Sequence, residues 1–206
     1  MRALGELYWW LFTYFHPALQ ILRKNRVKSL LDVGCGKGGP VKMLKCYKVG
    51  VDLNLRELKG CLKEKTHDDL ILADATHLPF RDKCFDAVIC LQVLHFIPKR
   101  DGWIAIKDME RAARKLVVLA MPIGAIPEMA SDGWESMWKP TEFTPRGYSV
   151  KLYGFRFLHR LALRKTGTLC SKLIFSIDPF INVFQSFIPC TRDYMICCKR
   201  MRLYQS

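Results

Sequence analysis

The sequence predicts a doubly wound α/β fold, in which helices cover both faces of a mostly parallel sheet of seven strands. Three observations predict this fold. The chain has 206 residues, half of them hydrophobic, which is enough for one domain with a full core. Between residues 27 and 121, short strands that are apolar along their whole length alternate with helical stretches, as in parallel sheets. A glycine-rich turn follows the first of these strands.

The expected elements of this core begin at residue 27. Five apolar runs are expected to form strands, at 27–33, 47–53, 69–74, 85–91 and 115–122. A helix is expected to begin at Gly39 and Pro40, because proline suits the first helical position. Two more helices are expected over 55–65 and 101–115; in the second, apolar residues recur near i, i+3 and i+4.

The segments outside the core are expected to belong to the same domain, 1–206. Residues 1–26 are expected to hold an N-terminal helix that packs on the domain or caps its site; an interfacial anchor and a membrane span are the alternatives. The C-terminal part, 122–206, begins with a long loop. It is expected to contain a short helix near 140–143, strands at 148–153 and 194–200, and an insertion at about 154–193.

Charge and cysteine content restrict the class of protein. The net charge of +14, from 33 Lys and Arg against 19 Asp and Glu, suggests an anionic partner such as nucleic acid, a membrane surface or an acidic substrate. The nine cysteines include no C-x-x-C pair, so their spacing predicts no metal site. Their odd number indicates reduced thiols and a cytoplasmic protein.

The turn in SLLDVGCGKGG, residues 29–39, fits two ligand-binding patterns. Gly34, Gly36 and Gly39 make G-x-G-x-x-G, which is typical of dinucleotide sites. Gly34, Gly36 and Gly38 make G-x-G-x-G. The glycines let the backbone bend sharply and approach a ligand, and by themselves they leave both patterns open.

Three aspartates, at or near the ends of the first three expected strands, favour the second pattern. Asp32 lies two residues before the first glycine, where it would repel a pyrophosphate but attract a ligand with an ammonium and a sulfonium group. Asp52 can accept hydrogen bonds from ribose hydroxyls, and Asp74 from an adenine amino group. Each aspartate alone could equally be a helix cap or a turn residue; together they favour a cationic nucleoside ligand.

The same stretches resemble, in order and spacing, the motifs of class I S-adenosylmethionine-dependent methyltransferases of the small type 11 kind. The stretches are LLDVGCGKGG, VGVDLN, LADATHLPF and FDAVICLQVLHFIP, within about residues 28–121. SMWKPTEFTPRGYSV also resembles the W-x-P-x-x-F…G-Y-x-V ending of many such enzymes. The resemblance implies a Rossmann-like fold and S-adenosylmethionine as the cofactor, and it is uninformative about the methyl acceptor.

The resemblance also implies ten cofactor-binding residues. The turn would shape the pocket for the methionine moiety. Asp52, at the end of the second strand, would bind the ribose, and Leu53 would pack on adenine. Asp74, at the end of the third strand, and Ala75 would contact the adenine edge and ring. Gln92 would lie near the methionyl end. In chain order the ten residues are Asp32, Gly34, Cys35, Gly36, Gly38, Asp52, Leu53, Asp74, Ala75 and Gln92.

Methyl transfer from a sulfonium is an in-line displacement that positioning alone can catalyse, and a base is needed only where the nucleophile carries a proton. His95, after the fourth strand, is the candidate base; its alternative role is structural. The family often has Glu-His at this place, whereas this chain has His95–Phe96. His67 and His77 are expected to be surface loop residues.

The insertion bears on the acceptor. From residue 143 to residue 177 there are seven Lys or Arg and no acid, and Arg156, Arg160 and Arg164 would share one helical face. The insertion could be a lid, a peripheral contact with an anionic membrane, or, least favoured, a nucleic-acid contact. We therefore predict a methyltransferase with a small-molecule or lipid-like acceptor; the alternatives are a methyltransferase acting on RNA and a non-catalytic cofactor-binding module.

Overall fold

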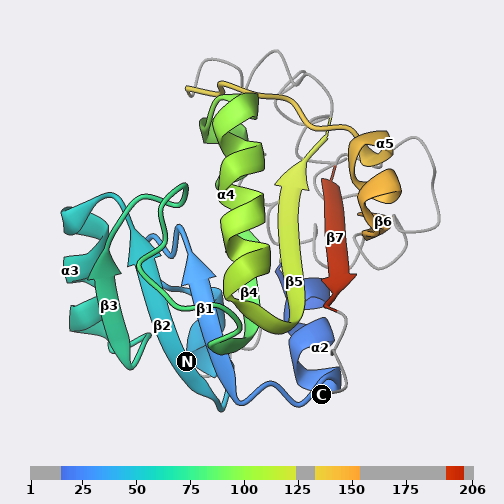
Figure 1. Ribbon diagram of the computed structural model, residues 1–206. Coiled ribbons are helices and arrows are strands. Elements are labelled where there is room, and N and C mark those ends of the chain that lie inside the picture. Colours follow the sequence, from blue (N-terminus) through green and yellow to red (C-terminus); the bar gives the residue numbers. More distant parts are fainter. Residues whose placement is uncertain (1–14, 124–132, 154–193, 202–206) are drawn as a thin grey trace, which may run out of the picture.

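The computed structural model describes residues 15–123, 133–153 and 194–201 (Figure 1). The expectations for the first part of the N-terminal segment and for the basic insertion fall outside these residues. Within them, no helix combines the length and the apolar character that a membrane crossing requires.

The described elements follow the expected alternation of strands and helices. The strands are β1 Ser29–Val33, β2 Tyr47–Asp52, β3 Asp69–Leu72, β4 Phe85–Leu91, β5 Ala113–Pro122, β6 Ser149–Tyr153 and β7 Tyr194–Arg200. The α-helices are α2 His16–Lys24, α3 Leu55–Glu64, α4 Lys99–Ala112 and α5 Pro140–Phe143. Short 3-10 turns are η1 Pro40–Met43, η2 Leu94–Phe96 and η4 Thr144–Arg146.

The seven strands form one sheet in the order β3-β2-β1-β4-β5-β7-β6. Strands β1 to β5 pair in parallel, and β7 runs antiparallel between β5 and β6. This arrangement confirms the predicted doubly wound, mostly parallel sheet. Because parallel strands end at the same edge, the segments that follow β1, β2, β3 and β4 meet there.

Alternating side chains of the strands face two separate layers of helices. Leu31 and Val33 of β1 pack in the cluster that contains Ile106 and Met109 of α4. Leu30 lies in a different cluster, whose helical members come from α2 and η1. Figure 1 shows α4 lying along the sheet beside β4 and β5. Helices therefore cover both faces, and each fully buried leucine contributes about 1.5–3 kcal/mol of hydrophobic stabilisation.

Two helix boundaries differ from the predicted ones. The helix expected after Gly39 is the single 3-10 turn η1, because Leu44 is already extended with ψ at 131° and leads directly into β2. Helix α4 begins earlier than expected, right after Pro98, and ends at Ala112. It ends there because Ala113 pairs with Phe85 of β4 and so starts β5.

The side chain of Trp138 packs the segment before α5 against helix α4. Its side chain is 1% exposed, and its Nε1 donates to Leu94 O at 3.0 Å. Its ring meets that of Trp103 edge to face, at 5.0 Å between centroids. A Cβ at Gly102 would lie 2.7 Å from the Trp138 ring, so the helix offers a glycine where the indole packs. The W-x-P-x-x-F segment thus closes one side of the core.

Trp138→Ala should lower the free energy of unfolding by about 3–5 kcal/mol, because it removes a fully buried indole and leaves a cavity. Trp138→Phe is the matched control; it keeps an aromatic ring and loses the hydrogen bond to Leu94 O, and should cost less. Urea denaturation at neutral pH measures both. A loss below about 1 kcal/mol for the alanine variant would show that this indole does not hold the segment.

Candidate functional site

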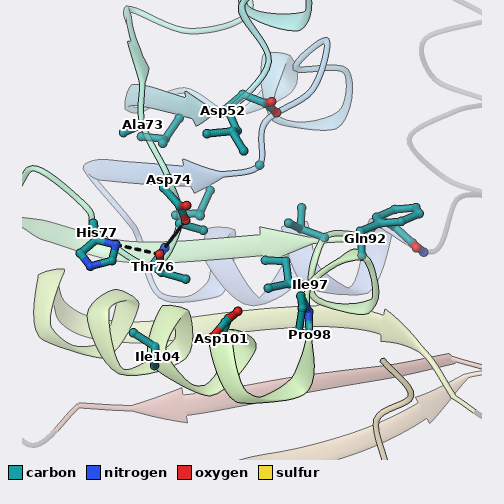
Figure 2. Close-up of a pocket in the computed structure, with 17 residues that line it drawn as sticks. Asp52, Ala73, Asp74, Thr76, His77, Gln92, Ile97, Pro98, Asp101 and Ile104 are labelled. Atoms are coloured by element: carbon teal, nitrogen blue, oxygen red, sulfur yellow. Dashed lines mark hydrogen bonds between the residues drawn. The ribbon is translucent and has the colours of Figure 1, made fainter. Parts of the chain in front are cut away.

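A cavity of about 740 Å³ opens at the carboxyl ends of the parallel strands (Figure 2). This volume falls within the range usual for sites that bind small molecules, about 300–1,000 Å³. The cavity lies where the chain order of the strands reverses, between β1 and β4, as expected for ligand sites in such sheets. Its lining comes from residues 33–34, 51–53, 73–77, 92–93, 96–98, 101 and 104.

Six of the ten residues predicted to bind a cofactor line this cavity. They are Gly34, Asp52, Leu53, Asp74, Ala75 and Gln92. In Figure 2, Asp52 lies at the end of β2, Asp74 just after β3 and Gln92 just after β4. These side chains lie together because the ends of parallel strands meet at one edge of the sheet, as the sequence predicts. Their role in binding stays a prediction.

The other predicted residues do not line the cavity. Asp32, Cys35, Gly36, Gly38 and His95 are not among the lining residues. Gly36 nevertheless reaches the site indirectly, because its N–H donates to Oδ2 of Asp52 at 2.8 Å. The glycine turn thus lines the cavity through Gly34 and also holds the side chain of Asp52, another lining residue, through Gly36.

Backbone hydrogen bonds lock the glycine turn onto the end of β2. The N–H groups of Gly34 and Cys35 both donate to Val51 O, at 2.7 and 3.0 Å. The N–H of Asn54 donates to Oδ1 of Asp52 at 2.8 Å, so both carboxylate oxygens of this aspartate are held by backbone donors. Each oxygen keeps lone pairs for a further donor from a ligand.

A side chain at Gly34 would be strained. The φ of this residue is +71°, in the left-handed region, and a Cβ would lie 2.2 Å from a methyl group of Val93. Val93 also lines the cavity. The backbone of the turn after β1 therefore packs directly against the Val93 side chain of the turn after β4.

Asp74 presents a charged carboxylate at the mouth of the cavity. Its Oδ1 accepts from both the N–H and the hydroxyl of Thr76, each at 2.8 Å. The Thr76 N–H, and then its hydroxyl, hold the pKa of Asp74 below the ordinary value. Thr76 Oγ1 also lies 2.8 Å from Nδ1 of His77, and Figure 2 shows this chain of three side chains. Asp74 therefore stays an acceptor near neutral pH.

The expectation that His67 is a surface residue is wrong. Its side chain is buried, and its Nε2 lies 3.2 Å from Oδ2 of Asp32. Its Nδ1 lies 2.9 Å from the hydroxyl of Thr66. Burial raises the pKa of Asp32, and the hydrogen bond from His67 opposes this rise. The signal that sequence reasoning missed is the alternation of β1, which directs Asp32 away from α4 and toward the β3 lead-in.

His95 is the middle residue of η2, and its side chain is buried. It is 3% exposed, and its Nδ1 has no hydrogen-bond partner in the described part of the chain. Its ring packs against those of Phe96 and Trp134, at 4.1 and 4.8 Å between centroids. Burial lowers the pKa of His95 to about 4, so the ring is neutral at pH 7. This geometry fits the structural alternative; the base role stays a prediction.

Gln92 connects the cavity to the last described strand. Its φ is +63°, which places the residue in the left-handed region at the end of β4. Its Nε2 donates to the hydroxyl of Tyr194, the first residue of β7, at 2.7 Å. The amide is therefore oriented by a residue 102 positions later in the chain.

Comparisons with known proteins show similarity to methyltransferases. Residues 31–121 match a protein family described as "Methyltransferase domain". The chain is 33% identical over 100 residues to probable tRNA methyltransferase 9B of Mus musculus, covering 45% of this chain and 21% of that protein. It is 34% identical over 84 residues to fatty-acid O-methyltransferase of Mycolicibacterium smegmatis, covering 37% and 31%. The aligned part spans less than a third of the length of these two relatives.

Solved structures show the same fold. A SAM-dependent methyltransferase from Archaeoglobus fulgidus superposes with a TM-score of 0.60 at 17% sequence identity. The match covers 95% of this chain and 98% of that one. The doubly wound sheet with its antiparallel strand at one side is therefore a fold that a methyltransferase is known to use.

The stability of the protein should depend on pH through His95. A histidine whose pKa is about 4 when folded and about 6.5 when unfolded contributes its full stabilisation above pH 6.5 and loses it as the pH falls toward 4. The wild type should lose up to about 3 kcal/mol more than His95→Leu between pH 7 and pH 4. Urea denaturation at several pH values measures the difference; parallel curves for the two proteins would contradict it.

Proposed function

We propose that this chain, whose residues 31–121 match the methyltransferase domain family, is a class I S-adenosylmethionine-dependent methyltransferase. It would transfer a methyl group from S-adenosylmethionine to a small-molecule or lipid-like acceptor. One observation carries the proposal: a single cavity joins the glycine turn, two strand-end carboxylates and an apolar rim. The first two suit the cofactor and the third suits the acceptor.

The residues at the strand ends suit the parts of the cofactor in turn. The carboxylate of Asp52, already fixed by two backbone donors, would accept from the ribose hydroxyls. Leu53 is 72% exposed beside it and offers an apolar surface on which adenine can pack. Asp74, held ionised by Thr76, would accept from the adenine amino group. Gln92 would meet the methionyl end.

Asp32 would act on the cofactor through its charge and not by lining the cavity. It is 4% exposed beneath the turn, and in the described residues its only ion-pair partner is His67. Together with Asp52 its carboxylate would contribute negative charge near the turn. A negative potential favours a ligand that carries an ammonium and a sulfonium, and it disfavours a pyrophosphate.

The chemistry would depend on positioning. S-adenosylmethionine supplies an electrophilic methyl group and a neutral thioether leaving group, so the protein has to align the acceptor atom with the methyl carbon and exclude water. The walls made by Gly34, Val93 and Gln92 would hold the methionyl side. His95 is buried, and we propose that its ring packs within η2 as a structural group and does not transfer a proton.

The rim of the cavity supports an apolar acceptor. Phe96 and Ile104 are large apolar side chains that are 48% and 42% exposed and line the mouth, together with Ile97 and Pro98. Exposed apolar residues gathered at a cavity mouth mark binding surfaces. A similar relative is named as a methyltransferase of fatty acids, which agrees with this rim.

RNA is the second candidate acceptor. The net charge of +14 provides the electrostatic attraction that nucleic acid binding needs, and another relative is named as a probable tRNA methyltransferase. The apolar rim favours the first candidate, because recognition of a base would call for stacking and for polar contacts to its edges.

Asp52→Ala should weaken the binding of S-adenosylmethionine about tenfold to a hundredfold, because charge-assisted hydrogen bonds to the ribose are lost. Asp68→Ala is the matched control: Asp68 also accepts from a backbone N–H, that of Lys48 at 2.6 Å, and it does not line the cavity. Isothermal calorimetry measures both affinities. Equal affinity for the Asp52 variant and the wild type would remove Asp52 from the site.

The acceptor class can be identified by incubating the protein with methyl-labelled cofactor and separated lipid, small-molecule, RNA and protein fractions of a cell extract. We expect label in the lipid or small-molecule fraction, and a strong reduction with Phe96→Asp, which places a charge on the apolar rim. Label in RNA would favour the second candidate. Cofactor binding without label in any fraction would support a non-catalytic binding module and contradict the proposal.

A further inference from the structure

Two thiols and an imidazole meet beneath the glycine turn, on the side away from the cavity. The sulfur atoms of Cys35 and Cys61 and a ring nitrogen of His67 all lie within 4.8 Å of one another. They come from three separate segments: the turn after β1, helix α3, and the residues before β3. Cys35 and Cys61 are 8% and 0% exposed, and the His67 side chain is buried as well. Cys61 and His67 were not predicted to bind the cofactor, and Cys35, which was, does not line the cavity.

The distance between the sulfurs fits a shared ion. Sγ of Cys35 and Sγ of Cys61 are 3.9 Å apart. Two thiolates bound tetrahedrally to zinc at about 2.3 Å are about 3.8 Å apart, whereas sulfurs in a disulfide are separated by about 2.05 Å. The observed distance between the two sulfur atoms therefore already matches that of two thiolates bound to one zinc ion. Cys61 at present donates to Gly36 O at 3.0 Å, a contact that ends when the thiol loses its proton.

The surroundings of the histidine also suit a cation. Oδ2 of Asp32 lies 3.2 Å from Nε2, and the hydroxyl of Thr66 lies 2.9 Å from Nδ1. A carboxylate that orients the imidazole is the usual partner of a metal-binding histidine. Neither Asp32 nor Asp52 is paired with a lysine or an arginine in the described part of the chain. The negative charge next to the cluster is therefore available to balance a dication.

We propose that Cys35, Cys61 and His67 bind a thiophilic divalent cation of the zinc type, with Asp32 orienting the imidazole. Soft thiolate ligands with an imidazole select zinc over magnesium and calcium, which prefer oxygen. Binding forms two metal–sulfur bonds and one metal–nitrogen bond and releases the two thiol protons to solvent; no oxidant takes part. Because Asp32 holds Nε2, the ligand atom of His67 would be Nδ1, and the Thr66 hydroxyl that now lies 2.9 Å from Nδ1 would turn away. The fourth position is left to water. The ion would tie the glycine turn to α3.

Cobalt titration of the full-length protein tests this site. The protein is stripped of metal with a chelator and titrated anaerobically with Co²⁺, whose thiolate bonds give a charge-transfer absorption. We expect saturation at one equivalent in the wild type and in Cys84→Ser, a variant of a half-buried thiol outside the cluster, and loss of the band in Cys61→Ser. Zinc should raise the melting temperature of the first two proteins and leave that of Cys61→Ser unchanged.

Two results would overturn the proposal: no thiolate band in the wild type, or the same band in Cys61→Ser. If Cys61→Ser does not fold, X-ray absorption of the zinc-loaded wild type decides instead. Its first shell should contain two sulfurs at about 2.3 Å together with nitrogen or oxygen. A shell of oxygen and nitrogen alone, or of four sulfurs, would contradict the assignment. None of these measurements depends on the proposed methyl transfer.

Discussion

The pairing of the glycine turn with the end of β2 is the interaction on which the site depends. Two successive N–H groups of the turn donate to the same carbonyl, Val51 O, and a third donates to the carboxylate of Asp52. These bonds place the turn after β1 beside the acid after β2 before any ligand arrives. Backbone donors on adjacent parallel strands can do this only because both strands end at one edge of the sheet. The cavity is thus prepared by the sheet itself.

The sequence predicts well which residues lie at this edge of the sheet, because a single property of parallel sheets determines them. In a parallel sheet, whatever follows each strand must gather at one edge, so Gly34, Asp52 and Asp74 could be brought together without knowing any helix packing. The mostly parallel sheet of seven strands and the two helical layers also agree with the pattern of apolar runs. The order of the strands and the antiparallel direction of β7 come from the structure alone. Long apolar strands leave few alternative arrangements.

What the sequence could not predict depends on side-chain direction and on contacts between segments. Asp32 precedes the glycines and was expected to line the pocket, yet the period of β1 turns it to the face opposite α4, where His67 meets it. His95 occupies the expected loop, but its ring is directed into the core by the packing of η2 and Trp134. Cys35 and Cys61 are 26 residues apart and match no spacing rule, so their proximity appears only when α3 is placed on the sheet.

The position of β7 bears on how the protein is made. This strand enters the sheet between β5 and β6, and its first residue, Tyr194, holds Gln92 at the edge of the cavity. During synthesis β1 to β5 leave the ribosome long before β7, so until then β5 has an open edge and Gln92 has no phenol to bind. A nascent chain that has made the whole glycine turn therefore still lacks the residue that orients Gln92. The lining of the cavity comes from residues 33–104, but the orientation of one of its side chains depends on a strand that is made about 90 residues later.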